Sequence, residues 1–186
     1  MKNIKVLALL LSCVLCFTAC GSAQQTPNDE QKQPQSSAET SGDVQTGKET
    51  EFVFVYEGVE IRVGHLMSEY LEALGEPSSY FESASCAFDG LDKTYNYSDF
   101  IITTYPIDDK DYVGGIELKS DMVETKEGVA LFETKADMIA AYGENYVDEN
   151  GMLVYYFDGN KANGKLCFII EGDEIGYIEY QASSAE

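Results

Sequence analysis

The run Ser68-Glu-Tyr-Leu-Glu-Ala-Leu-Gly-Glu-Pro77 has the pattern of a short helix that stops abruptly. Its apolar residues form one stripe that begins at Leu66, and its glutamates fall on the other side. Gly75 provides a helix stop, and Pro77 prevents the helix from resuming. A run of the same kind, Ala136-Asp-Met-Ile-Ala-Ala-Tyr-Gly-Glu-Asn145, follows later in the chain. The two runs predict two short helices that each end at a glycine.

A second pair of matching segments follows the predicted helices in the same order. Val113–Leu118 and Ile175–Tyr180 both read aliphatic, Gly, any residue, Ile, Glu, large apolar. Self-similarity of this kind indicates a duplicated supersecondary unit. We therefore predict an α+β fold in which two tandem helix-plus-antiparallel-sheet repeats form one domain over 51–186, with copies at about 59–119 and 127–181.

The duplication leads to specific structural predictions. Gly75 and Gly143 should both end helices, and at least one of them should have a positive φ. Ile116 and Ile178 should both be buried under the helix of their own copy. The second helix should begin at a capping box, Thr134-Lys-Ala-Asp137.

Alternation of apolar and polar residues predicts antiparallel strands in both copies. The first prediction is a hairpin over 51–63, and Ser78–Ser85 is predicted to be a polar loop. The remaining predicted strands are Ser85–Phe88, Lys93–Tyr97, Phe100–Tyr105, Tyr112–Lys119, Val129–Phe132, Met152–Phe157, Lys165–Ile170 and Glu174–Tyr180.

The N-terminus has the pattern of a signal peptide over residues 1–19. Lys2 and Lys5 form a positive region, and Val6–Phe17 is an apolar core too short to span a bilayer permanently. Phe17-Thr-Ala-Cys20 resembles the lipobox of bacterial lipoproteins, and this resemblance implies that Cys20 is lipidated and becomes the new N-terminus. The alternative is an ordinary secretory signal that is cleaved nearby.

Residues 20–50 are predicted to be a lipidated cysteine followed by a disordered tether, because the segment is rich in Ser, Gln, Thr, Gly and Pro. The predicted location is therefore the extracytoplasmic face of the cell membrane. The formal net charge of the 186-residue chain is −21, which disfavours nucleic acid as a partner. Solubility explains an acidic surface, and a basic partner surface is the alternative explanation.

Two of the five cysteines, Cys86 and Cys167, lie in the predicted domain. An exported protein could bridge them. Both lie in apolar runs, however, and we favour two buried, reduced thiols.

The sequence contains no recognisable catalytic or metal-binding constellation. His65 is the only histidine, and it lacks a nucleophile motif that it could serve as a base. Asp158, Asn160 and Asn163 begin like a calcium loop, but Ile169 stands where the closing glutamate belongs. We therefore predict no enzyme activity, no catalytic residues, no cofactor and no metal site, and the acidic turns leave weak calcium binding open.

Tyrosine is unusually frequent, with 13 residues and no tryptophan. Its large contact area and polar tip suit a binding face, although core packing explains tyrosines in strands equally well. We choose as candidate binding residues the tyrosines and glutamates expected on the solvent-exposed face of the predicted sheet. They are Tyr95, Tyr97, Tyr177, Glu117 and Glu179.

Leu74–Pro77, Tyr142–Gly143 and the strands after each are similar to the fold of the beta-lactamase inhibitor protein and of small outer-membrane assembly lipoproteins, over roughly 59–180. This resemblance implies a protein that binds other proteins through a sheet face and catalyses nothing. We accordingly expect a lipid-anchored cell-surface module that engages a protein or peptide. The alternative is a solute-binding or hydrolytic lipoprotein with a site between the two repeats.

Overall fold

The computed structural model describes residues 51–183, so the predicted signal peptide, Cys20 and the tether lie outside the described residues. The helical elements are short, and they are η1 (Met67–Glu69), α1 (Leu71–Leu74), α2 (Lys135–Tyr142) and η2 (Phe157–Gly159). The strands are β1 (Phe54–Tyr56), β2 (Val59–Ile61), β3 (Ser79–Ala84), β4 (Leu91–Asn96), β5 (Phe100–Ile107), β6 (Lys110–Leu118), β7 (Val147–Glu149), β8 (Met152–Tyr156), β9 (Lys165–Glu171) and β10 (Glu174–Gln181).

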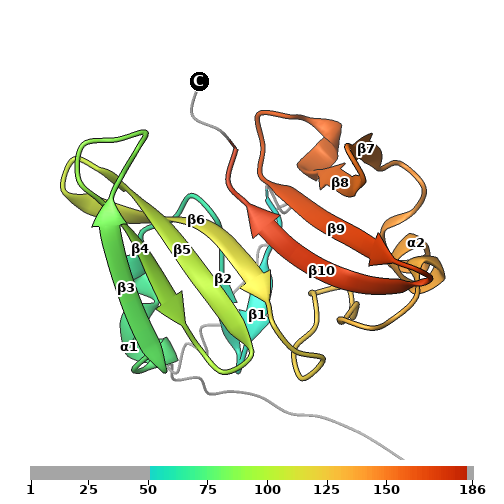
Figure 1. Ribbon diagram of the computed structural model, residues 1–186, viewed down its shortest axis with the longest axis horizontal. Coiled ribbons are helices and arrows are strands. Elements are labelled where there is room, and N and C mark those ends of the chain that lie inside the picture. Colours follow the sequence, from blue (N-terminus) through green and yellow to red (C-terminus); the bar gives the residue numbers. More distant parts are fainter. Residues whose placement is uncertain (1–50, 184–186) are drawn as a thin grey trace, which may run out of the picture. The chain divides into compact units, whose positions relative to one another are not determined.

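Eight of these strands form one antiparallel sheet, with the order β3-β4-β5-β6-β10-β9-β8-β7. It consists of two four-stranded meanders that meet where β6 pairs with β10 (Figure 1). β1 and β2 form a separate hairpin. Short hairpin turns between most neighbouring strands explain why the whole sheet is antiparallel.

The prediction of an α+β fold built from two helix-plus-sheet repeats is wrong, because the described chain is mostly strand. The run 68–77, which suggested one helix, contains only the end of η1 and the four residues of α1, and α1 has no side-chain N-cap. An isolated turn of helix is costly to nucleate, and a stripe of apolar residues cannot lengthen it once Gly75 and Pro77 intervene. Ser78–Ser85, predicted to be a loop, contains β3 instead.

Several local predictions are confirmed. Gly75 and Gly143 end their helices with φ of 68° and 81°. Thr134 and Asp137 form the predicted capping box, in which each side chain bonds the backbone N–H of the other residue. These signals are local, so they hold although the predicted fold class does not.

The core lies on one face of the large sheet, which we call the core face. Ile116 and Ile178 contribute to it from the sheet with no exposed surface, so the prediction that both are buried is confirmed. Phe54 of the hairpin, Met67 of η1 and Met138 of α2 belong to the same cluster, so these elements pack on the core face. Figure 1 shows the hairpin and α1 behind the strands. We call the opposite face, which carries Glu117 and Glu179, the open face.

Candidate functional site: the acidic centre of the open face

The centre of the open face is where β6 pairs with β10. Glu117 lies directly opposite Glu179 in the register, beside the pair of Ile116 with Tyr180 on the core face. Because successive side chains point to opposite faces of a sheet, the two glutamates share the open face. The neighbouring side chains across the sheet, in the same row of paired residues, are Ile101 on β5 and Cys167 on β9.

Glu179 is held in one orientation by its neighbours on β10. Tyr177 donates its hydroxyl to Glu179 Oε2 at 2.7 Å, and Gln181 Nε2 donates to the same oxygen. The other oxygen, Oε1, lies over the backbone of Gly115, where an added Cβ would be only 2.8 Å away. The absence of a side chain at Gly115 therefore leaves the space that this carboxylate occupies.

Glu117 is half-buried, and its electrostatic environment is unfavourable. Burial raises the pKa of Glu117, and repulsion from Glu179 raises it further, while Lys119 acts in the opposite direction. The Lys119 ammonium donates to the carbonyl of Tyr97 at 2.9 Å. Like charges directly opposite each other in a sheet are destabilising. This pair of carboxylates would therefore be stabilised by a cationic group.

A second polar group lies farther out on the open face, on β7 and β8. Tyr156 donates its hydroxyl to Glu149 at 2.5 Å, and this bond is the main reason that the pKa of Glu149 is lowered. Lys161 lies 3.5 Å from Glu149 and 5.1 Å from the centre of the Tyr156 ring. Within residues 51–183, Glu149 therefore already has a cation at ion-pairing distance.

Cys167 lies between these two groups with its thiol fully buried. Burial raises the pKa of Cys167 to about 12, and the negative charges of Glu179 and Glu149 also act to raise this pKa. The thiol is therefore protonated at neutral pH. Because the thiolate is the reactive form of cysteine, this arrangement does not activate Cys167 as a nucleophile.

The structure brings together three of the five predicted binding residues: Glu117, Tyr177 and Glu179. Tyr95 and Tyr97 lie on the core face instead, with 7% and 6% of their surface exposed. The register explains their burial, since Tyr95 lies opposite Ile102 of the core. Both belong to the main hydrophobic cluster, so they are not available on the open face.

Sequence reasoning missed Gln181, Cys167, Glu149 and Tyr156 as members of the open face. Gln181 could have been found, because it continues the alternation of Tyr177 and Glu179 along one strand. Glu149 and Tyr156 come from neighbouring strands, and only the register places them on the same side.

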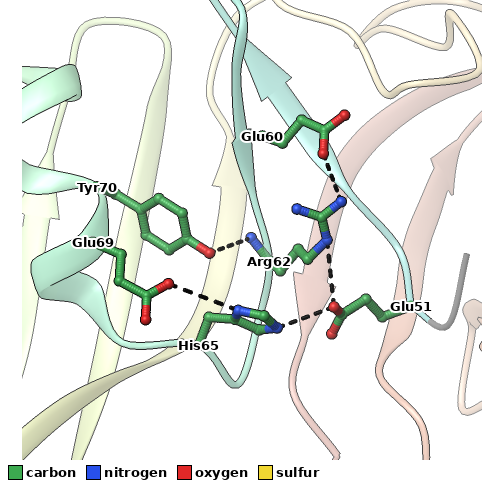
Figure 2. Close-up of polar contacts among 6 residues, drawn as sticks. All are labelled: Glu51, Glu60, Arg62, His65, Glu69 and Tyr70. Atoms are coloured by element: carbon green, nitrogen blue, oxygen red, sulfur yellow. Dashed lines mark hydrogen bonds and ion pairs between the residues drawn. The ribbon is translucent and has the colours of Figure 1, made fainter. Parts of the chain in front are cut away.

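His65 lies in a polar cluster beside β2 and η1 (Figure 2). Its Nε2 lies 3.0 Å from Glu51 Oε1, which is also 3.3 Å from Arg62 Nε. Glu69 lies 3.9 Å from His65 Nδ1, and the backbone N–H of Arg62 donates to the Tyr70 hydroxyl at 3.3 Å. These contacts attach the first described residue to the domain.

Two hollows lie near the β8–β9 connection. The larger, of about 580 Å³, is lined by Tyr156, Lys161, Asn163 and Lys165, among others. The smaller, of about 280 Å³, is lined by Glu51, His65, Tyr105 and Asn163, among others. Within residues 51–183, the histidine that lines the smaller hollow, His65, contacts Glu51 and not a serine, threonine or cysteine.

No family model, curated protein or solved structure matches the chain. Within residues 51–183, no group of three or more His, Cys, Asp or Glu side chains is arranged to hold a metal ion. In the same part of the chain, no helix has both the length and the apolar character needed to cross a bilayer.

Proposed function

We propose that the protein is a lipid-anchored binding module on the extracytoplasmic face of the cell membrane, and that its open face engages a basic segment of a protein or peptide. The anchor is proposed from Phe17-Thr-Ala-Cys20 and the tether after it. The binding role is proposed from the open face. The single observation that carries it is the pair Glu117 and Glu179.

Charge complementarity supports a basic partner. The pair brings two carboxylates together on a half-buried surface, in a chain with a net charge of −21. A lysine or arginine side chain of a partner would remove the repulsion between them, and a guanidinium could hydrogen-bond both carboxylates. Attraction by the whole acidic chain would also raise the association rate.

The neighbouring side chains support a protein or peptide as the source of that cation. Tyr177 lies beside the pair, and tyrosine contributes large contact area at protein interfaces. Ile101 flanks Glu117 on the other side and is only partly covered. An extended segment with a basic residue between apolar ones would match this order of side chains.

The experiment is fluorescence anisotropy with the full chain in detergent and a labelled nonapeptide of alternating Arg and Ser. The double variant Glu117→Gln/Glu179→Gln should bind this probe about tenfold more weakly than the wild type, which corresponds to about 1.4 kcal/mol. A peptide of alternating Glu and Ser should show no binding.

The matched control is the double variant Glu72→Gln/Glu144→Gln, which makes the same change in net charge at exposed positions on α1 and just after α2. Its affinity should stay within about twofold of the wild type, because surface charges away from a contact contribute little. Equal losses in the two double variants would show that net charge alone attracts the probe, and would refute the assignment to Glu117 and Glu179.

A further inference from the structure

The two edges of the large sheet differ in length and protection. β7, at one edge, has three residues, and short edge strands are a common protection against unwanted pairing. β3, at the other edge, has six residues, and every one is exposed. Within residues 51–183 β3 pairs only with β4, so its outer backbone groups have no strand partner there.

Three common devices that block pairing along an edge, namely proline, lysine and a bulge, are absent from β3. Its sequence, Ser79-Tyr-Phe-Glu-Ser-Ala84, contains no proline and no lysine. It pairs with β4 over six consecutive residues without a bulge that would twist the edge away. Half of the N–H and C=O groups of a regular edge strand point outward. β3 therefore presents a continuous template for another strand.

Apolar side chains stand on both faces of this edge. Phe81 is 63% exposed and lies opposite Thr94, on the side of the open face. Tyr80, which is also exposed, packs against Tyr95 on the core face with ring centres 5.1 Å apart and the rings tilted. A hollow of about 240 Å³ on that face is lined by Leu71 of α1 and Tyr95, among others. The edge thus offers apolar contacts for alternate side chains of an added strand.

Electrostatics favour a basic partner over a second copy of this chain. Glu82 lies on β3 itself, and Asp92 lies opposite Ser83 on β4. The cation facing Glu82, Lys93, is bound to Asp111 at 2.7 Å. Pairing two copies through β3 would bring two acidic edges and two net charges of −21 together.

We infer that β3 accepts an extended segment of a partner protein, with Lys or Arg alternating with apolar residues, as a ninth strand of the sheet. In this mode the backbone hydrogen bonds supply affinity and the alternate side chains supply specificity. The apolar residues would contact Phe81 on the side of the open face, and the basic residues, on the opposite side of the added strand, would face Glu82. The inference does not depend on the acidic centre of the open face.

The experiment is hydrogen–deuterium exchange of the full chain in detergent, with a blocked octapeptide of alternating Lys and Val as the probe. We expect slower amide exchange in residues 79–84, separate from any change at the acidic centre of the open face. Two control peptides are needed. One replaces Lys by Glu, and the other is N-methylated at two adjacent central residues, which removes donors from both of its edges.

Protein variants sharpen the test. Phe81→Ser should weaken binding of the Lys–Val peptide about fivefold, whereas Phe132→Ser, at a 60% exposed phenylalanine elsewhere, should leave it unchanged. Glu117→Gln/Glu179→Gln should also leave the protection of 79–84 unchanged. No protection of 79–84, or equal protection by the Glu–Val or N-methylated peptide, would overturn the inference.

Discussion

Glu117 of β6 lies directly opposite Glu179 of β10, at the junction of the two four-stranded halves of the sheet. The two carboxylates are not equivalent, because Tyr177 and Gln181 donate to Glu179 while burial raises the pKa of Glu117. One carboxylate is therefore held in one orientation by two donors, and the other is half-buried beside it. A single guanidinium or ammonium group between them could contact both carboxylates.

Replacing Glu117 by Gln should stabilise the unliganded protein at neutral pH. The pKa of Glu117 is raised in the folded state, so the folded state binds this proton more readily than the unfolded chain. Ionised Glu117 consequently opposes folding above its folded-state pKa, and this cost disappears as the pH falls below about 4, the range of an ordinary glutamate. Thermal unfolding should show a higher Tm for Glu117→Gln at pH 7 and no difference at pH 4.

Glu144→Gln provides the control for this effect, because Glu144 is exposed and lies outside the sheet. Its Tm should equal that of the wild type at both pH values. A stabilisation of Glu117→Gln that persists unchanged at pH 4 would mean that the repulsion between carboxylates is not its cause.

Gly115→Ala should disturb the acidic centre without unfolding the sheet. The added Cβ would lie 2.8 Å from Glu179 Oε1 and 3.0 Å from Thr103 Oγ1, and both are side-chain atoms that can move. We expect a loss of about 1–3 kcal/mol in the free energy of unfolding, the usual cost of an added methyl group in a packed region. Binding of the Arg–Ser peptide should nevertheless weaken several-fold, measured by anisotropy. Unchanged affinity would show that the orientation of Glu179 is irrelevant to binding.

The sequence predicted those features that depend on neighbouring residues or on strand alternation. The Thr134–Asp137 capping box and the glycine stops are local signals, and both are present. Alternation along β10 correctly separated buried Ile178 from Tyr177 and Glu179. Three of the five candidate binding residues were thereby placed on one surface.

The errors concern features that depend on pairing across the sheet. β3 is exposed along its whole length, so its composition resembles a loop, and only its ladder with β4 makes it a strand. Alternation along β4 does not say which face of the sheet Tyr95 occupies. Tyr95 is buried because it belongs to the hydrophobic cluster on the core face. The repeated motifs do not determine the fold class. A glycine stop defines where a helix ends and not how long the helix is.

Ile116→Ala and Ile178→Ala should each lower the free energy of unfolding by about 2–4 kcal/mol, because each removes buried methyl groups and leaves a cavity. Both side chains are completely buried in the sheet. Ile107→Ala, at an exposed isoleucine near the end of β5, should cost much less. Urea unfolding of the three variants measures the difference, and a cost at Ile107 equal to the other two would contradict the placement of the core.

Cys20→Ser should abolish the proposed lipid anchor. When the full chain is expressed in a bacterium, the wild type should partition with the membranes and carry the additional mass of acyl chains on its N-terminal peptide. The variant should lose both properties, since lipidation requires the thiol of Cys20. A wild-type protein without acyl mass would refute the lipoprotein proposal and favour an ordinary secretory signal.

Cys86 and Cys167 should differ sharply in reactivity. The prediction that both are buried is wrong for Cys86, which is exposed in the turn between β3 and β4. Cys167 is buried on β9, and burial raises its pKa to about 12. Four strand spacings of about 4.8 Å separate β4 from β9, so a bridge, which needs Cα atoms within about 7 Å, cannot form in this fold.

Peptide mapping after treatment of the native chain with iodoacetamide at pH 8 should find Cys86 alkylated and Cys167 unmodified, and treatment in 6 M guanidinium should make the two equally reactive. Alkylation of Cys167 at a rate similar to that of Cys86 in the native protein would show that the open face around Glu179 is far more accessible to solvent than this structure allows.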